Sequence, residues 1–177
     1  MSVFFELVSA RESCRSYADK PVEKEKLVKC IEAARLSPSA CNSQPWSFYV
    51  VNGGKKRDET AACVQGMGMN KFTDKAPAFI IVCEEKANLS AKLGGAVKDN
   101  HFAPIDIGLA VAHICYAATE QGLSTCILGW LDNKKLSRVM GAQKRVRVVV
   151  AVGYAADCTL REKKRKTLDE IMVYADE

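Results

Sequence analysis

The segment from Ile105 to Gln121 constrains the fold of this 177-residue chain more than any other. It has the length of a helix and carries apolar side chains on nearly all sides. A helix without a polar face is buried, either in the centre of a domain or against a partner chain. Because Asp106 and His113 interrupt it, the segment is too short and too polar to cross a bilayer. We therefore expect a globular domain built around this helix.

Length and composition predict one soluble domain over residues 1–177. Hydrophobic residues make up 48 % of the chain and charged residues 27 %, close to the average for globular proteins. Charged side chains interrupt residues 1–20, so we expect no signal peptide and a cytoplasmic location. The eight cysteines form no CxxC pair and have no regular spacing, which favours reduced thiols over a disulfide framework. The two histidines lack zinc-type spacing, so no metal site is expected.

The modest net charge of +5 leaves several kinds of partner open. Two basic stretches stand out, residues 134–147 and 161–166. Such a patch is compatible with nucleic acid, with a solvated surface or with a pocket for a phosphorylated small molecule. Since no helix-turn-helix, zinc-finger or RNA-binding signature accompanies it, we expect no nucleic-acid partner.

Strands alternating with helices indicate an α+β or α/β layer fold around one sheet. The continuous apolar run Phe79–Cys83 predicts a buried central strand. Residues 84–103 are ambiguous, and residues 167–177 have no core pattern of their own. The expected helices are 2–9, 23–36, 55–65, 105–121 and 133–140, and the expected strands are 46–51, 79–83, 124–129 and 146–154.

A candidate anion site follows the first expected helix. Arg11 and Arg15 are four residues apart with Ser13 between them. Guanidinium groups bind phosphate oxygens in a bidentate manner, and a hydroxyl adds a further donor. The alternative is a helix C-terminus with favourable cations, and the motif alone does not decide between the two.

Three further motifs could contribute to a ligand site. The loop from Ser37 to Trp46 offers amides and hydroxyls able to read the edge of a planar heterocycle, although it could be an ordinary connection. The segment Gly122–Trp130 ends a strand on a glycine, which lets a ligand approach the backbone. The run Lys163–Lys166 taken alone is typical of a solvated basic face.

Together and in this order, the four motifs resemble the nitroreductase family of flavin-dependent oxidoreductases. The elements are R-x-S-x-R-x-Y from Arg11, P-S-A-C-N-S-Q-P-W-S-F from Pro38, G-L-x-T-C-x-x-G from Gly122 and K-x-R from Lys163. The resemblance covers almost the whole chain. It implies an α+β, three-layer fold with a central, mostly antiparallel sheet flanked by helices, in an intertwined homodimer.

The same resemblance implies an FMN site at the subunit interface. Arg11, Ser13 and Arg15 would hold the FMN phosphate and ribityl chain, and Lys163 and Arg165 would approach the same phosphate. Leu128 and Gly129 would pass beside the ring. The tail from about residue 160 to 177 is expected to extend along the partner subunit. The residues expected to line the flavin from the neighbouring subunit are Pro38, Ser39, Ala40, Asn42 and Gln44.

The chain departs from the family pattern at three places. Glu12 stands where many members carry a basic or neutral residue, so we expect its side chain to point away from the phosphate. Ser124 replaces a position that is commonly glycine, which would narrow the approach to the ring. Residues 66–103 leave little room for the excursion that roofs the substrate pocket of longer members.

The function implied is hydride transfer from NAD(P)H through FMN to a small acceptor such as a nitroaromatic or a quinone, with ping-pong kinetics. The protein itself would supply no catalytic acid or nucleophile. One alternative is a flavin-binding sensor or carrier without significant turnover. A second is a Cys–His hydrolase, although His113 is expected to be a buried structural residue. His101 could line the substrate pocket.

Overall fold

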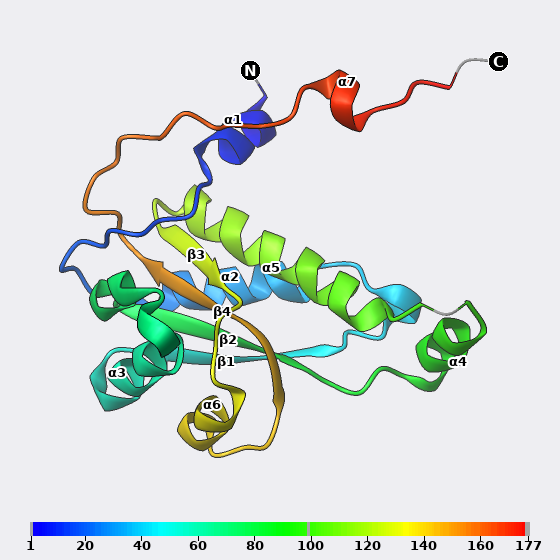
Figure 1. The fold of residues 1–177 in the computed structure, drawn as a ribbon, viewed down its shortest axis with the longest axis horizontal. Coiled ribbons are helices and arrows are strands. Elements are labelled where there is room, and N and C mark those ends of the chain that lie inside the picture. Colours follow the sequence, from blue (N-terminus) through cyan, green and yellow to red (C-terminus); the bar gives the residue numbers. More distant parts are fainter. Residues whose placement is uncertain (1, 99, 176–177) are drawn as a thin grey trace.

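A four-stranded antiparallel sheet forms the centre of the molecule in the computed structural model, which describes residues 2–98 and 100–175 (Figure 1). The strand order is β1-β2-β4-β3, and all three ladders between these strands are antiparallel. The expected central antiparallel sheet is therefore confirmed. The strands are β1 (Trp46–Asn52), β2 (Ala78–Glu84), β3 (Ser124–Leu128) and β4 (Arg145–Gly153).

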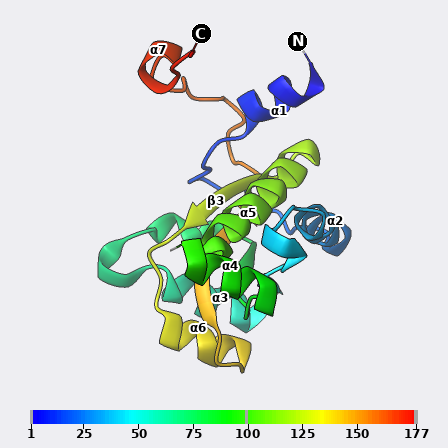
Figure 2. The same ribbon diagram turned by 90° about the vertical axis from the view of Figure 1, so that its right-hand side faces the viewer.

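Helices cover both faces of this sheet (Figures 1 and 2). One face packs against α2 (Lys24–Arg35) and α5 (Phe102–Glu120), and the other against α3 (Gly54–Cys63) and α6 (Asn133–Met140). The three-layer arrangement expected from the sequence is present. The remaining elements are α1 (Val3–Ala10), α4 (Leu89–Lys98), α7 (Leu168–Ile171) and the short 3-10 turns η1 (Ala40–Asn42), η2 (Gly66–Gly68) and η3 (Lys71–Lys75).

Strand β2 is buried on both of its faces, which explains its run of apolar residues. Successive side chains of a strand point to opposite faces. Ile80 and Val82 lie in the core beneath α2 and α5, whereas Phe79 and Ile81 lie in the core beneath α3 and α6. Both sets are fully buried, so the positions from Ala78 to Cys83 have to be apolar, and only Glu84 at the end of the strand is charged. The buried central strand expected at 79–83 is confirmed.

Helix α5 is the central helix that the sequence analysis expected, and it begins at Phe102 rather than Ile105. Pro104 lies in its first turn, where a missing N–H removes no helical hydrogen bond. The helix is long and apolar enough to be considered as a membrane span. Its stripe of Ile107, Val111 and Ile114, however, packs on the sheet and α2. We therefore describe α5 as a core helix.

The expected elements agree with the observed ones to within three residues at either end. The two segments that the sequence did not assign also contain helices. The ambiguous part between residues 84 and 103 contains α4, and the tail contains the single turn α7. Every described residue of α7 is exposed, as a segment without a core pattern should be.

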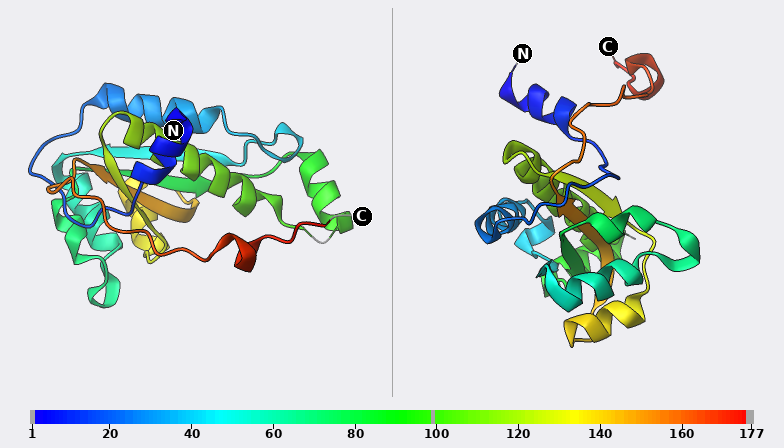
Figure 3. Two further views of the ribbon diagram at one scale, coloured as in Figure 1. Left: turned by 90° about the horizontal axis from the view of Figure 1, so that it is seen from above. Right: turned by 90° about the vertical axis from the view of Figure 1, so that its left-hand side faces the viewer.

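The two ends of the chain leave apolar side chains exposed. Helix α7 stands apart from the sheet and its helices, and α1 lies at the edge of the molecule against α5 (Figures 2 and 3). On α1, Phe4 and Phe5 are each about 60 % exposed, although the Phe4 ring lies 6.1 Å from that of Tyr116 on α5. Exposed apolar residues continue on α5, at Ile105 and Leu109, and along the tail. One copy of the chain therefore leaves much apolar surface uncovered.

Gly153 provides a test of the packing at the end of β4. A Cβ atom there would lie 2.6 Å from Pro77 Cδ and 2.8 Å from Tyr17 Cδ1. We expect Gly153→Ala to lower the free energy of unfolding by about 1–3 kcal/mol, measured by urea denaturation. The control is Gly94→Ala in α4, where a Cβ meets nothing within 4 Å. It should raise stability by about 0.5–1 kcal/mol. Equal effects of the two variants would contradict the packing described here.

Candidate cofactor site

The segment from Arg11 to Tyr17 is held against the sheet by backbone pairing. Ser13 forms a parallel bridge with Thr125 at the start of β3, and the Cys14 N–H donates to the Thr125 carbonyl at 2.9 Å. Cys14 and Tyr17 point into the core, which leaves Ser13 half-buried and Arg15 exposed. The two buried residues anchor the segment in the core, and Arg15 and Ser16 between them are exposed to solvent.

The C-terminal strap, residues 155–167, returns to this segment from the end of β4. It begins with a bridge between Tyr17 and Ala155 and a hydrogen bond of 3.0 Å from the Ala156 N–H to the Ser16 carbonyl. The strap and the Arg11–Tyr17 segment then border a pocket of about 310 Å³, which we call the cationic pocket. The pocket is lined by Arg11, Glu12, Ser13, Arg15, Arg161, Glu162, Lys163, Lys164 and Arg165. All five residues expected at the phosphate are thus brought together.

Lys163 has contacts that its expected role did not include. Its Nζ donates to the carbonyl oxygens of Val8 at 3.0 Å and Arg11 at 2.8 Å, and also to that of Ser9. These carbonyls belong to the C-terminal turn of α1, where a cation is favourable. Partial burial lowers the pKa of the Lys163 ammonium, and the nearby Arg11 guanidinium adds to this effect. Lys163 lies beside the pocket but directs its three donors to the protein.

Glu12 and Arg161 form a pair that the sequence analysis did not find. Arg161 Nε lies 3.2 Å from Glu12 Oε2, and Arg161 Nη2 donates to the Ser13 carbonyl at 2.7 Å. The sequence analysis expected the Glu12 side chain to point away from the phosphate. Glu12 instead lines the same pocket as Arg11 and Arg15, with its carboxylate paired to Arg161. Arg161 was recognised only as part of a basic run, because nothing in the sequence indicates which acidic residue would face it.

The loop from Pro38 to Gln44 has a strained backbone. Cys41, Asn42 and Gln44 have φ values of 52°, 49° and 46°, in the left-handed region. Such conformations cost free energy in residues other than glycine and persist only where the surroundings hold them. Within the loop, the Gln44 N–H donates to Ser39 Oγ at 2.9 Å, and Gln44 Nε2 donates to Asn42 Oδ1 at 3.0 Å. The five loop residues expected at the flavin therefore form one ordered unit.

Two residues outside the loop fix its position, and the sequence analysis missed both. Asp106 of α5 is 5 % exposed, and both of its carboxylate oxygens lie 3.2 Å from the Ala40 N–H. Asn88 Nδ2 donates to the Cys41 carbonyl at 3.0 Å. The acidic residue near the start of the apolar segment 105–121 was the available signal, because a buried carboxylate needs a hydrogen-bond partner.

Within one copy, this loop lies far from the cationic pocket. It contacts the N-terminal end of α5 through Asp106, whereas the Arg11 charge acts on Cys115, nine residues further along the same helix. Nine residues of helix correspond to about 14 Å. Within one copy, the loop and the pocket therefore lie near different parts of α5.

Leu128 ends β3, three residues beyond the Thr125 bridge to Ser13, and Gly129 follows it directly. The Leu128 side chain is 3 % exposed and lies in the core beneath α3 and α6, so only its backbone could contact a ligand. Gly129 is exposed, and a Cβ there would meet nothing within 4 Å. A ligand could therefore approach the backbone at Gly129 without meeting a side chain.

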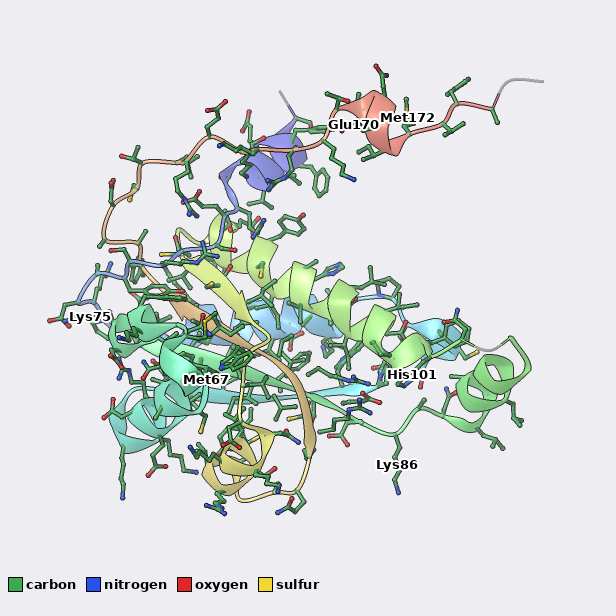
Figure 4. The ribbon with its side chains drawn as sticks, viewed as in Figure 1. Met67, Lys75, Lys86, His101, Glu170 and Met172 are labelled. Carbon is green, nitrogen blue, oxygen red and sulfur yellow. The ribbon has the colours of Figure 1, made fainter. Side chains whose placement is uncertain are left out.

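A second cavity, of about 620 Å³, lies next to the loop and near the N-terminal end of α5. Asp106 lines it together with His101, whose position is labelled in Figure 4. His101 Nε2 lies 3.4 Å from Glu84 Oε1. His101 therefore does line a pocket, as considered from the sequence. His113 differs from the expectation, since it is half-buried, and its Nδ1 lies 2.8 Å from the Leu109 carbonyl oxygen.

The thiols give no support to a Cys–His hydrolase. Among the described residues, neither histidine ring has a cysteine as a hydrogen-bond partner. Burial raises the pKa of the Cys126 thiol, and it raises that of Cys30 to about 11. A thiol with a raised pKa is a poor nucleophile at neutral pH.

The donor set of the cationic pocket fits a phosphate group. Arg11, Arg15 and Arg165 supply guanidinium groups, and Ser13 supplies a hydroxyl. Glu12 is the acidic exception, and its charge is compensated by Arg161. Charge-assisted donors converging from two chain segments are what a phosphate dianion requires. The residues present therefore fit the phosphate of a mononucleotide cofactor.

Comparison with known sequences identifies the same group of proteins. A profile described as "Nitroreductase family" matches residues 8–154. Iodotyrosine deiodinase 1 of Rattus norvegicus is 26 % identical, over 96 % of this chain and 68 % of the relative. An Archaeoglobus fulgidus protein provisionally named NADH dehydrogenase/NAD(P)H nitroreductase is 29 % identical, over 89 % of this chain and 88 % of the relative.

Comparison with solved structures gives the same fold. A nitroreductase family protein from Streptococcus pneumoniae has a TM-score of 0.82 and 25 % identity, covering 97 % of this chain and all of the other. A provisionally assigned nitroreductase from Exiguobacterium sibiricum, solved in complex with FMN, has a TM-score of 0.78 and 20 % identity, covering 99 % of this chain and 98 % of the other.

Asp106 provides a test of how the strained loop is held. Asp106→Ala removes the acceptor of the Ala40 N–H and leaves that amide unpaired near a buried position. We expect a loss of about 1–3 kcal/mol in the free energy of unfolding and faster hydrogen exchange at the Ala40 amide. Asp106→Asn keeps one oxygen acceptor and should restore most of the protection. Unchanged exchange in the alanine variant would show that the carboxylate does not hold the loop.

Proposed function

Because the chain belongs to the nitroreductase family, we propose that it is an FMN-dependent oxidoreductase. The proposed reaction carries hydride from NAD(P)H to a small acceptor such as a nitroaromatic or a quinone. The observation that carries this proposal is the cationic pocket, in which Arg11, Ser13 and Arg15 meet Arg165 from the other end of the chain. Such a pocket suits the phosphate of FMN.

The residues divide into two groups in this proposal. Arg11, Ser13, Arg15 and Arg165 bind the phosphate and the adjoining ribityl chain. Lys163 lies next to this group and contributes its positive charge, while its donors hold the C-terminal turn of α1. The backbone at Leu128 and Gly129 passes beside the ring.

The second group comes from a partner copy in a homodimer. The loop residues Pro38, Ser39, Ala40, Asn42 and Gln44 line the flavin of the neighbouring subunit. The exposed apolar faces of α1 and α5 support this arrangement, because association would remove them from water. The tail from about residue 160 extends along the partner, and residues 1–177 form one domain.

When bound, FMN would supply the hydride-transfer chemistry, used in turn by NAD(P)H and by the acceptor, which predicts ping-pong kinetics. The role of the chain itself is to bind FMN and to orient it. The cationic pocket holds the anion, the strained loop presents amide and hydroxyl groups, and the open backbone at Gly129 leaves room for the ring. No thiol or histidine of the chain needs to act as a nucleophile.

The acceptor class has a second candidate. Relatives named iodotyrosine deiodinase match nearly the whole chain, so iodinated phenols belong in any panel of acceptors tested. The other alternative is a flavin-binding sensor or carrier without significant turnover, which would bind FMN through the same pocket.

The absorption spectrum of the purified protein tests the proposal. We expect the spectrum of an oxidised flavin, bleached by NADH or NADPH without air and restored by an acceptor. A protein that binds FMN but is not reduced by either nucleotide would be the sensor or carrier. A protein with no affinity for FMN would refute both.

Arg15 and Arg165 provide the mutational test. Arg15→Ala and Arg165→Ala each remove one charge-assisted phosphate contact, so each should weaken FMN binding about 10- to 100-fold. The matched control is Lys134→Ala, which removes an exposed cation from α6. It should leave the dissociation constant within about twofold. If both arginine variants retain FMN as tightly as the parent, the assignment of the phosphate is wrong.

A further inference from the structure

The C-terminal strap is attached to the motif segment by very few contacts. After the hydrogen bond from Ala156 to Ser16, the described strap residues reach the rest of the chain through hydrogen bonds of Arg161 and Lys163. An extended segment without strand pairing is held in one place only by such contacts. The position of Arg165 at the pocket therefore depends on what Arg161 and Lys163 bind.

Arg161 makes the contacts that fix the strap beside the phosphate motif. Glu12 Oε2 accepts from Arg161 Nε at 3.2 Å and from the Arg161 backbone N–H at 3.4 Å. Arg161 Nη2 donates to the Ser13 carbonyl at 2.7 Å. One carboxylate oxygen thus holds both the side chain and the backbone of the same strap residue. The Glu12 side chain is 24 % exposed and that of Arg161 is 57 % exposed, so solvent partly screens the pair and the hydrogen-bond geometry carries the contact.

Charge alone does not explain why a carboxylate lies in this pocket. Glu12 stands between Arg11 and Ser13, next to the position proposed for a phosphate dianion. An unpaired carboxylate there would repel the anion. The Glu12 carboxylate has a clear role if it holds the strap, because the strap cations repel those of the motif and need a compensating contact.

We propose that Glu12 is a positioning residue that latches the strap through Arg161 and so places Arg165 at the cofactor phosphate. This inference rests on the proposed function for the identity of the ligand. The latch itself is a property of the chain without ligand. Glu12 and Arg161 act on the anion through the strap, whereas Arg11, Arg15 and Arg165 contact it.

The direction in which Glu12→Ala changes FMN affinity separates the latch from simple electrostatic repulsion. Glu12→Ala removes a negative charge next to the phosphate position, so FMN binding should tighten if the carboxylate only repels. If the carboxylate latches the strap, the same variant should weaken FMN binding by about tenfold. Arg161→Ala should weaken binding by a similar factor.

The full-length protein, with and without FMN, is used for the test. Hydrogen exchange of residues 158–166 is measured without FMN, and FMN affinity is measured by flavin fluorescence. Both single alanine variants should increase the exchange. The double variant Glu12→Arg with Arg161→Glu reverses the pair, and should restore both slow exchange and FMN affinity to within about threefold of the wild type. Lys166→Ala, the matched loss of a strap cation, should change neither.

Tighter or unchanged FMN binding in Glu12→Ala would overturn the latch. Weaker FMN binding with unchanged hydrogen exchange would also overturn the latch. A reversed pair that restores neither slow exchange nor FMN affinity would do the same, since Arg161 would then act as a direct phosphate ligand. Failure of the wild type to bind FMN would refute the proposed function and the phosphate role of the latch. The exchange measurements would still decide whether the pair holds the strap.

Discussion

The convergence of like charges at the two ends of the chain is the constraint on which the rest of the site depends. Four cations lie close together: Arg11 and Arg15 from the first motif, and Lys163 and Arg165 from the strap. Their mutual repulsion opposes the approach of the strap to the first motif unless anions or dipoles compensate for it. The C-terminal carbonyls of α1 and the Glu12 carboxylate do so within the protein, and a phosphate completes the compensation in the proposed complex.

The sheet and α5 determine how far apart the two halves of the site lie. Strand β3 pairs near its start with the Arg11–Tyr17 segment, through the Ser13 bridge, and α5 holds the Pro38–Gln44 loop at its N-terminal end, through Asp106. A rigid core helix keeps these regions separate within one copy. The exposed apolar faces of α1 and α5 then favour a second copy, whose loop would complete the site.

The elements were predictable from the sequence where one pattern dominated. The run 79–83 predicted a buried central strand, and the apolar segment from Ile105 predicted a buried helix, either in the domain centre or against a partner chain. Contacts between distant residues were not predictable, because periodicity carries no information about which polar groups meet. The Glu12–Arg161 pair, the Asp106 acceptor and the use of Lys163 on α1 all depend on the folded path of the strap and loop. The motifs indicated the candidate phosphate residues, and the structure shows that Lys163 among them already donates to carbonyls of α1 and Arg11.

The affinity for FMN relative to riboflavin is the most direct measure of the central claim, because the two ligands differ only in the phosphate. If several guanidinium groups bind that phosphate, FMN should bind at least about 100-fold more tightly than riboflavin, and the difference should shrink as salt increases. Arg165→Ala should reduce FMN affinity while leaving riboflavin affinity unchanged. Equal affinities of the wild type for both ligands would contradict the account.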